Sequence, residues 1–351
     1  MPDDPKADSP PPSLAAAEAE FVRGNRIARR TLRVAAMATL AIVLGACLLP
    51  AGPVQKTLAT GLIIGSVIWA LTVGGLLILR LRSRPLTRVA RRTPDATFGH
   101  VSASQLAAMV EEAGREFEGR EQPAIYVLRE QAANAFAINT RYLNIVAPFN
   151  AVYLTTGLLA RLDREEVRAI LLHELAHFHR YIYADYTTKL ALQMVLGTAI
   201  ATAWRCFQAY GNVAGVIAFL AIIAPIGMGL SARVDRHIEF LCDHFAARRA
   251  GLLPMVNALV VIGRANRAWA ATKGLSRMIA RKLKGRSRLD WASVDSLVPN
   301  GRIEPDEYPR LIALLRERRD AVLVDDMIDV ESNSHPSLAR RILFLDATGV
   351  R

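Results

Sequence analysis

Four long runs without a charged residue dominate the hydrophobic pattern of the chain, at residues 34–49, 57–79, 190–204 and 213–230. About twenty apolar residues cross the hydrocarbon core of a bilayer, so the run at 57–79 is long enough to span a membrane. The run at 34–49 is shorter, but it extends back past Arg33 if that side chain reaches the headgroups. These two runs predict a transmembrane hairpin over residues 31–83.

The later pair of runs predicts a second transmembrane hairpin over residues 188–230. Both runs are short for a span, and the second contains Pro225. A pair of buried helices or a re-entrant hairpin is the alternative.

Arginine residues are concentrated at the two outer ends of the first hairpin. They are Arg23, Arg26, Arg29, Arg30 and Arg33 before it, and Arg80, Arg82, Arg84, Arg88, Arg91 and Arg92 after it. The loop between the two runs has only Lys56. Because basic loops stay on the cytoplasmic side, we expect a multi-pass integral membrane protein whose N-terminus and catalytic domain are cytoplasmic.

Shorter elements occupy the rest of the chain. Residues 102–117 have the period of an amphipathic helix, whereas 124–128 and 152–154 favour β-strands. Asp163, followed three residues later by Glu166, is typical of a capped helix start. We therefore expect a mainly helical, zincin-like α+β catalytic domain with a small sheet, in two parts over 84–187 and 231–351. Residues 1–30 are expected to be a disordered basic tail.

The net charge of +12 also restricts the partners of the chain. Its cations lie beside the predicted spans, which favours anionic lipid headgroups over nucleic acid. The basic stretch 277–288 is either interfacial or solvated. The three cysteines (Cys47, Cys206 and Cys242) have no spacing typical of disulfides or structural zinc, as in a reducing cytoplasm.

The sequence His173-Glu174-Leu175-Ala176-His177 lies in an apolar, helical stretch. Two histidines four residues apart share one helix face, so both imidazoles can bind the same Zn²⁺. Glu174 is then placed to take a proton from a water on the metal. We predict one zinc per chain, with Glu174 as the catalytic base. His179 lies on nearly the opposite face and cannot join this site.

A catalytic zinc needs a third protein ligand and an open position. The metzincin pattern is excluded, because Arg180 and Tyr183 stand where it requires Gly and His. A glutamate on a second helix is the remaining common arrangement, and Glu239 is the candidate. Asp243, four residues later, would accept the outer N–H of His173. The alternative is a solvated helix face that these carboxylates share with Arg233, Arg236 and Arg248.

Four separated blocks resemble HtpX-type membrane zinc metallopeptidases, gluzincins related to the CAAX prenyl proteases. The blocks are Asn134–Ala137, Thr156–Leu159 running into Glu165-Glu166 and the H-E-L-A-H helix, Glu239-Phe240-x-x-Asp243, and Ser334–Ser337 followed by Arg340-Arg341-Ile342. The resemblance implies an integral membrane endopeptidase with zinc on His173, His177 and Glu239. Cys242, Ser337 and the aromatic stretch 178–183 depart from the family pattern and leave substrate preference open.

The resemblance also implies how substrate is held. A strand beside the zinc helix, with Asn134, Ala135 and Phe136, would bind substrate through its backbone, although an ordinary core hairpin is the alternative. His335 would be an oxyanion donor or an extra ligand, or only a residue that leads into a helix.

The activity that the resemblance implies is hydrolysis of membrane or misfolded proteins, as quality control in a bacterial inner membrane. A CAAX-type prenyl protease, or a catalytically silent membrane scaffold or chaperone, is the alternative.

Overall fold

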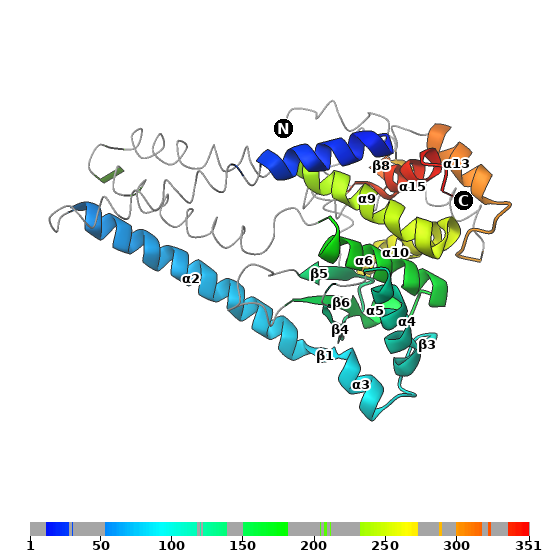
Figure 1. The fold of residues 1–351 in the computed structure, drawn as a ribbon, viewed down its shortest axis with the longest axis horizontal. Helices are drawn as coiled ribbons and strands as arrows, with labels where there is room; N and C mark the ends of the chain where they lie inside the picture. The colour runs from blue at the N-terminus through cyan, green and yellow to red at the C-terminus, as the bar shows by residue number, and fades with distance from the viewer. Residues whose placement is uncertain are drawn as a thin grey trace.

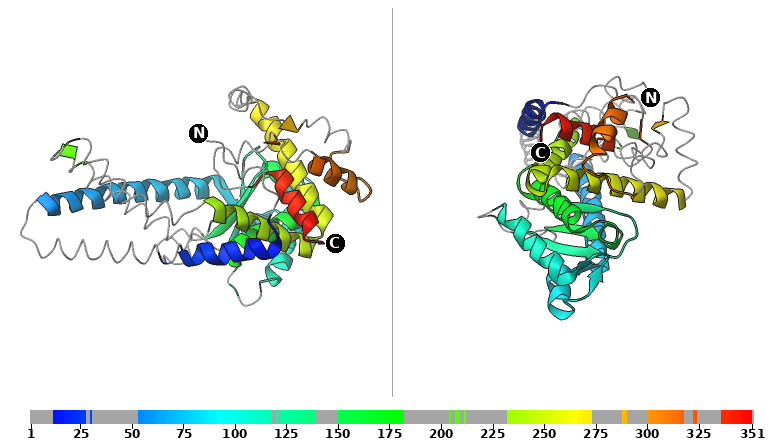
Figure 2. Two further views of the ribbon diagram at one scale, coloured as in Figure 1. Left: turned by 90° about the horizontal axis from the view of Figure 1, so that it is seen from above. Right: turned by 90° about the vertical axis from the view of Figure 1, so that its right-hand side faces the viewer.

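Among the described residues, a body built around a small sheet carries the long projecting helix α2 (Pro53–Arg82) (Figure 1). The computed structural model describes residues 12–27, 30, 53–117, 120, 122–138, 150–181, 204, 207–208, 211, 232–272, 288–289, 300–317, 322–323 and 336–350. In the body, helices pack beside the sheet, and the two termini of the described chain lie on the same side (Figure 2).

The main sheet has four strands in the order β1 (Ser83–Pro85), β4 (Ala124–Leu128), β6 (Ala151–Thr155) and β5 (Ala135–Ile138). β4 and β6 are parallel, and the outer pairs are antiparallel. The strands predicted at 124–128 and 152–154 are thereby confirmed. Two further pairs are β2 (Thr97–Phe98) with β3 (Val101–Ser102), and β7 (Arg288–Leu289) with β8 (Val322–Leu323).

The side chains of β6 alternate between two apolar layers, as the period of a strand requires. Val152 and Leu154 belong to the main core, whereas Tyr153 packs on the opposite face with Tyr126 of β4 and Leu79 of α2. The sheet therefore joins the long helix to the main core of the chain.

The helices after α2 are mostly short. They are α3 (Leu86–Arg92), α4 (Ala103–Arg115), α5 (Thr156–Leu159), α6 (Arg164–His179), α9 (Ala232–Ala250), α10 (Leu252–Thr272), α13 (Tyr308–Glu317) and α15 (Leu338–Ala347). A side chain of the preceding residue caps α4, α5, α6 and α15. α4 confirms the amphipathic helix expected over 102–117: Ser102 caps it, and Leu106 and Met109 are buried. Between α9 and α10, Gly251 has φ +105°, a conformation that glycine adopts without strain.

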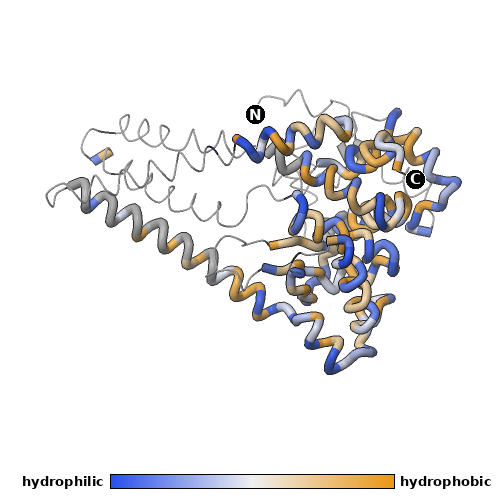
Figure 3. The backbone as a smooth tube through the Cα atoms, in the orientation of Figure 1, coloured by the Kyte–Doolittle hydropathy of each residue, from blue (hydrophilic) through white to orange (hydrophobic). Residues whose placement is uncertain are grey.

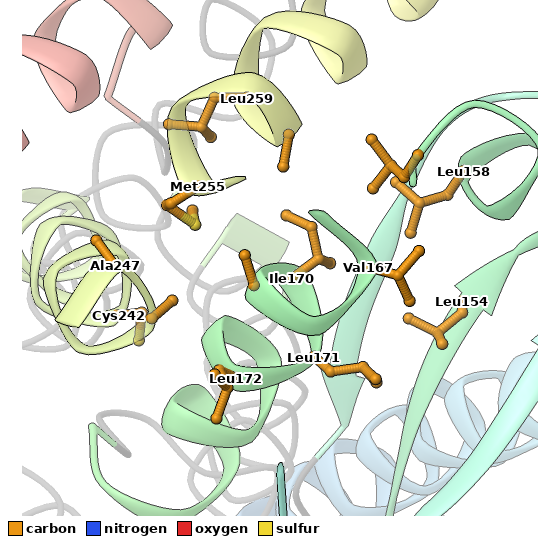
Figure 4. Packing of buried hydrophobic residues seen from close by; sticks show 14 of the residues in the cluster. Leu154, Leu158, Val167, Ile170, Leu171, Leu172, Cys242, Ala247, Met255 and Leu259 are labelled. Carbon is orange, nitrogen blue, oxygen red and sulfur yellow. The ribbon is translucent and has the colours of Figure 1, made fainter. Parts of the chain in front are cut away.

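α6 lies at the centre of the core. Val167, Ile170, Leu171 and Leu172 project from it towards Leu154 and Leu158 on the sheet side, and towards Cys242, Ala247, Met255 and Leu259 of α9 and α10 (Figure 4). Twelve of its residues are buried, including both polar and apolar ones. A helix with this many buried residues is a rigid support for a functional site.

The N-terminal segment differs from the disordered tail that we expected. Residues 14–27 form a helix, and Ser13 begins it by accepting a hydrogen bond from the Ala16 N–H at 3.2 Å. Figure 3 shows hydrophobic and hydrophilic residues interspersed along it. Leu14, Ala17 and Phe21 follow a helical period and pack against the body, which outweighs the disorder-favouring composition of the segment.

The predicted membrane spans are only partly within the described residues. Residues 57–79 lie in α2, whereas 34–49 and the runs at 190–204 (apart from Trp204) and 213–230 lie outside the described residues. No helix in the described ranges combines the length and hydropathy needed to cross a bilayer. The two hairpins therefore stay predictions.

Candidate metal centre

The start of α6 is fixed by interactions of its own sequence. Asp163 accepts a hydrogen bond from the Glu166 N–H at 2.9 Å, and Glu166 accepts one from the Asp163 N–H at 2.8 Å. This confirms the predicted capping box. Arg302 donates to both oxygens of Glu166, at 2.7 and 2.9 Å, so the buried Glu166 carboxylate is paired as well. The helix that carries the two histidines is thus anchored at its first turn.

Three side chains converge near the end of α6. The Nε2 atoms of His173 and His177 are 3.0 Å apart, and each faces the carboxylate of Glu239 on α9. Glu239 Oε1 lies 3.1 Å from His177 Nε2, and Oε2 lies 3.6 Å from His173 Nε2. Within the described ranges these three residues form a cluster that could hold a metal ion.

The donor set fits a zinc ion. Neutral imidazole nitrogens and a carboxylate oxygen are the ligands of one common class of catalytic zinc site. Two ring nitrogens that face each other across 3.0 Å, beside a carboxylate, present their lone pairs to a single point. The solvated-face alternative for Glu239 is wrong, because its side chain is 6% exposed and faces both histidines.

Asp243 lies behind His173, as expected from its spacing. Its Oδ1 is at hydrogen-bonding distance, 2.9 Å, from His173 Nδ1. The Asp243 side chain is fully buried, and Arg341 of α15 donates to both of its oxygens at 2.6 Å. Arg341 also approaches Glu239 Oε2 at 3.4 Å.

Arg341 is the site residue that sequence reasoning missed. It lay within the Arg340-Arg341-Ile342 block, but no role was assigned to it. The available signal was chemical: a buried carboxylate that orients a histidine needs a cation or several donors. Asp243 and Arg341 are 98 residues apart, so nothing local pointed to the pair.

The electrostatics of the cluster reflect its burial. Burial disfavours a charged His173, but Asp243 and Glu239 outweigh this and raise the pKa of His173 to about 10. Burial also raises the pKa of the Asp243 carboxyl, yet Arg341 and then His173 hold that pKa below its usual value. Protons and metal ions compete for the same nitrogen, so a site that attracts a proton this strongly suits a cation.

Burial differs among the site residues in a way that leaves one side open. The His177 side chain is 23% exposed, whereas that of His173 is 5% exposed. Glu174 follows His173 directly and is also buried. Solvent therefore reaches the cluster from the side of His177. His179 is buried away from it, against Phe117 and Phe178.

The expected substrate strand lies in β5, which contacts α6. Among the described residues β5 pairs only with β6, so it is an edge strand of the sheet. The Thr155 N–H donates to the Asn134 carbonyl at 3.0 Å, which makes this a hydrogen-bonded pair. By the antiparallel alternation, Ala135 and Ala137 then direct their backbone groups away from β6.

Asn134 and Phe136, the other two residues of the predicted substrate strand, make their contacts with β6 instead. Asn134 uses its backbone carbonyl on Thr155, and the Phe136 ring stacks on Tyr153 with centroids 5.1 Å apart. His335 lies outside the described residues. Ser337, two residues later, caps α15 by accepting a hydrogen bond from the Arg340 N–H at 3.2 Å.

The model of peptidase family M48 matches residues 101–348. The "Protease HtpX homolog" of Sulfurovum sp. (strain NBC37-1) is 30% identical over 163 residues, covering 42% of this chain and 53% of that protein. The "Protease HtpX" of Legionella pneumophila (strain Corby) is 31% identical over 160 residues, covering 42% and 54%.

A third relative, the "Protease HtpX homolog" of Desulfatibacillum aliphaticivorans, is 32% identical over 158 residues, covering 41% of this chain and 49% of that protein. The chain thus spans about half the length of the curated relatives it matches. No solved structure matches. Because the family match covers most of the chain and includes both histidines, Glu239 and Arg341, the chain belongs to peptidase family M48 and resembles metallopeptidases of the HtpX type.

Proposed function

We propose that this protein is a zinc-dependent endopeptidase with His173, His177 and Glu239 as metal ligands. The observation that carries the proposal is the convergence of these three side chains beside the buried Glu174. The membership of the chain in peptidase family M48 agrees with this assignment.

The residues divide the chemistry between them. When bound at this site, zinc would lower the pKa of water and polarise the scissile carbonyl. The Glu174 carboxylate accepts the proton of the attacking water and returns it to the leaving amine. Asp243 holds the tautomer of His173 that presents Nε2 to the metal, and Arg341 holds Asp243 ionised.

The substrate is proposed to bind as an extended peptide along β5. The outward backbone groups of Ala135 and Ala137 would pair with it, in the manner of an added strand. Backbone pairing recognises an extended chain more than particular side chains, which suits unfolded segments of proteins.

Membrane and misfolded proteins are the proposed substrate class, in a protein quality-control role. Support for a membrane location comes from α2, whose exposed apolar residues include Ile63, Val67 and Leu71, at 64%, 53% and 71% exposure. These are four residues apart and form one stripe. Exposed apolar area on this scale is stabilised by contact with lipid or protein.

The test is cleavage of an unfolded model protein such as casein by the detergent-purified chain with zinc supplied. Glu174→Gln should bind zinc with unchanged stoichiometry but lose at least about 100-fold in turnover, because it removes a general base. Glu239→Ala should lose bound zinc. A wild-type cleavage rate in Glu174→Gln would contradict the proposed function.

A further inference from the structure

The helix at 14–27 contacts the part of the body that carries the metal centre. In Figure 1 it is the dark-blue helix beside α9, and Figure 2 also shows it next to α9 and α15. Ala17 is fully buried in a cluster with Phe240, Leu241 and Phe344. Leu14 and Phe21 of the same helix, together with Tyr181, pack around this cluster.

The contact is made by specific side chains on one face of the helix. The Phe21 ring meets the Tyr181 ring edge-on, with centroids 5.5 Å apart at 84°. The Phe240 and Phe344 rings lie 4.8 Å apart. Ala17 supplies the small side chain that lets the helix approach these rings. The opposite face is open to solvent, including Ala19.

Each residue touched by the helix is close in sequence to a residue of the metal centre. Phe240 directly follows Glu239, and Phe344 lies one turn beyond Arg341 on α15. Tyr181 follows the end of α6, and its N–H donates to the Ala176 carbonyl at 2.9 Å. One helix thus packs on α9, on α15 and on Tyr181 just beyond the end of α6, the three places next to the proposed metal ligands and their supporting charges.

The helix also lies outside the part of the chain that matches the peptidase family, which begins at residue 101. We propose that helix 14–27 is a positioning element of the metal centre: by clamping the end of α6, α9 and α15 together, it sets the relative placement of the histidines, Glu239 and Arg341. This inference rests on the metal site of the proposed function. It makes zinc affinity dependent on a segment that touches no metal ligand.

A matched pair of full-length variants tests the inference. Ala17→Glu places a carboxylate in the buried contact, whereas Ala19→Glu makes the same change on the exposed face two residues away. Zinc affinity is measured by competition with a fluorescent chelator in detergent. We expect Ala17→Glu to bind zinc about tenfold more weakly, the scale seen when support around a ligand is lost. Ala19→Glu and the conservative Ala17→Ser should stay within about twofold of the wild type.

A second readout separates positioning from general loss of structure. The visible absorption of Co²⁺ bound in place of zinc depends on the placement of the ligands. We expect the band positions to shift in Ala17→Glu. A wild-type spectrum of lower amplitude would mean partial unfolding and would overturn the inference, as would zinc affinity equal to that of Ala19→Glu. If Ala17→Glu does not yield folded protein, Phe21→Ala, which removes the ring contact with Tyr181, takes its place under both readouts.

The outcomes also distinguish this inference from the proposed function. A wild-type chain that binds neither zinc nor Co²⁺ overturns both. A wild-type chain that binds zinc, with variants that bind it equally well, overturns only the role of the helix.

Discussion

Asp243 is a fully buried carboxylate whose charge is tolerated because two partners surround it. Arg341 binds both of its oxygens, and His173 lies on its other side. Burying an ion is costly unless it is paired with good geometry, and removing one partner leaves the other uncompensated. At the scale of residues, the site is therefore a chain of charges in which Arg341 supports the proposed ligand His173 through Asp243 and also approaches Glu239 directly.

Replacing Arg341 should affect both stability and metal binding. Arg341→Leu should destabilise the protein by about 3–5 kcal/mol, because the Asp243 charge stays buried without its partner. Zinc affinity should fall about 10- to 100-fold. Arg341→Lys keeps the charge but cannot bind both oxygens in a fork, so its losses should be intermediate. Urea unfolding and zinc competition measure the two effects; unchanged zinc affinity in Arg341→Leu would contradict the role assigned to this residue.

Metal binding should release a proton from His173. Its pKa is raised from 6.5 to about 10 in the folded, metal-free protein, so the imidazole is charged between these values. The stability that this charge contributes is fully present below pH 6.5 and is lost as pH rises through about 10. Zinc must displace the proton, so its affinity should rise about tenfold per pH unit in this window. Calorimetric titrations at pH 7.5 in two buffers of different ionisation enthalpy should show about one proton released per zinc. Equal heats in both buffers would contradict the release of a proton from His173 on zinc binding.

At the scale of elements, β5 lies beside α6, which is the arrangement that the proposed substrate binding requires. Thr155 links the segment that leads into β5 to the start of α5, because its hydroxyl donates to the Ala132 carbonyl at 2.7 Å and accepts from the Leu158 N–H at 3.2 Å. Gly157 allows the same close approach: a Cβ there would lie 2.1 Å from the Gln131 carbonyl oxygen. The edge strand is therefore held in place from the first turn of α5.

Ala137→Pro should weaken substrate binding without breaking the sheet. Proline removes the N–H that points away from β6 and is tolerated on edge strands. Loss of one hydrogen bond, about 1 to 1.5 kcal/mol, corresponds to about a tenfold lower kcat/KM, mainly through KM. Ala137→Val, which keeps the N–H, is the control. The measurement is kcat/KM for cleavage of an extended peptide. Equal losses of kcat/KM in both variants would argue against backbone pairing.

At the scale of the whole molecule, α2 extends the body outwards from the sheet (Figure 1). Arg80 at its end lies over the Tyr126 ring at 5.2 Å, so the helix meets the sheet through a cation–π contact. The exposed arginines Arg82, Arg84, Arg88, Arg91 and Arg92 follow on β1, α3 and the end of α2. An apolar stripe followed by a cluster of arginines is typical of a helix that leaves a membrane on its cytoplasmic side.

The whole chain should therefore stay with the membrane fraction after washing with alkaline carbonate. Burial of the apolar runs in lipid would provide the stabilisation that resists extraction. An immunoblot of the membrane fraction and the supernatant detects the chain after the wash. Glu174→Gln, which keeps every apolar run, is the control. Release of the chain into the supernatant would contradict membrane insertion.

The sequence alone determined the features that depend on local geometry. The spacing of His173 and His177, the capping box of Asp163 and Glu166, and the strand at 124–128 follow from the periods of helix and strand, which act within a few residues. Predictions of this kind were confirmed because the physical cause lies in the same short segment.

Only the tertiary structure decided the long-range pairings. It placed Glu239 against the histidines, joined Asp243 to Arg341, paired β4 with β6 and docked the helix at 14–27, which its composition had suggested was disordered. Each of these depends on which apolar faces bury each other, and many partners are compatible with a single amphipathic stripe. Packing of α6, α9 and α15 into one core selects among them and thereby assembles the candidate metal centre.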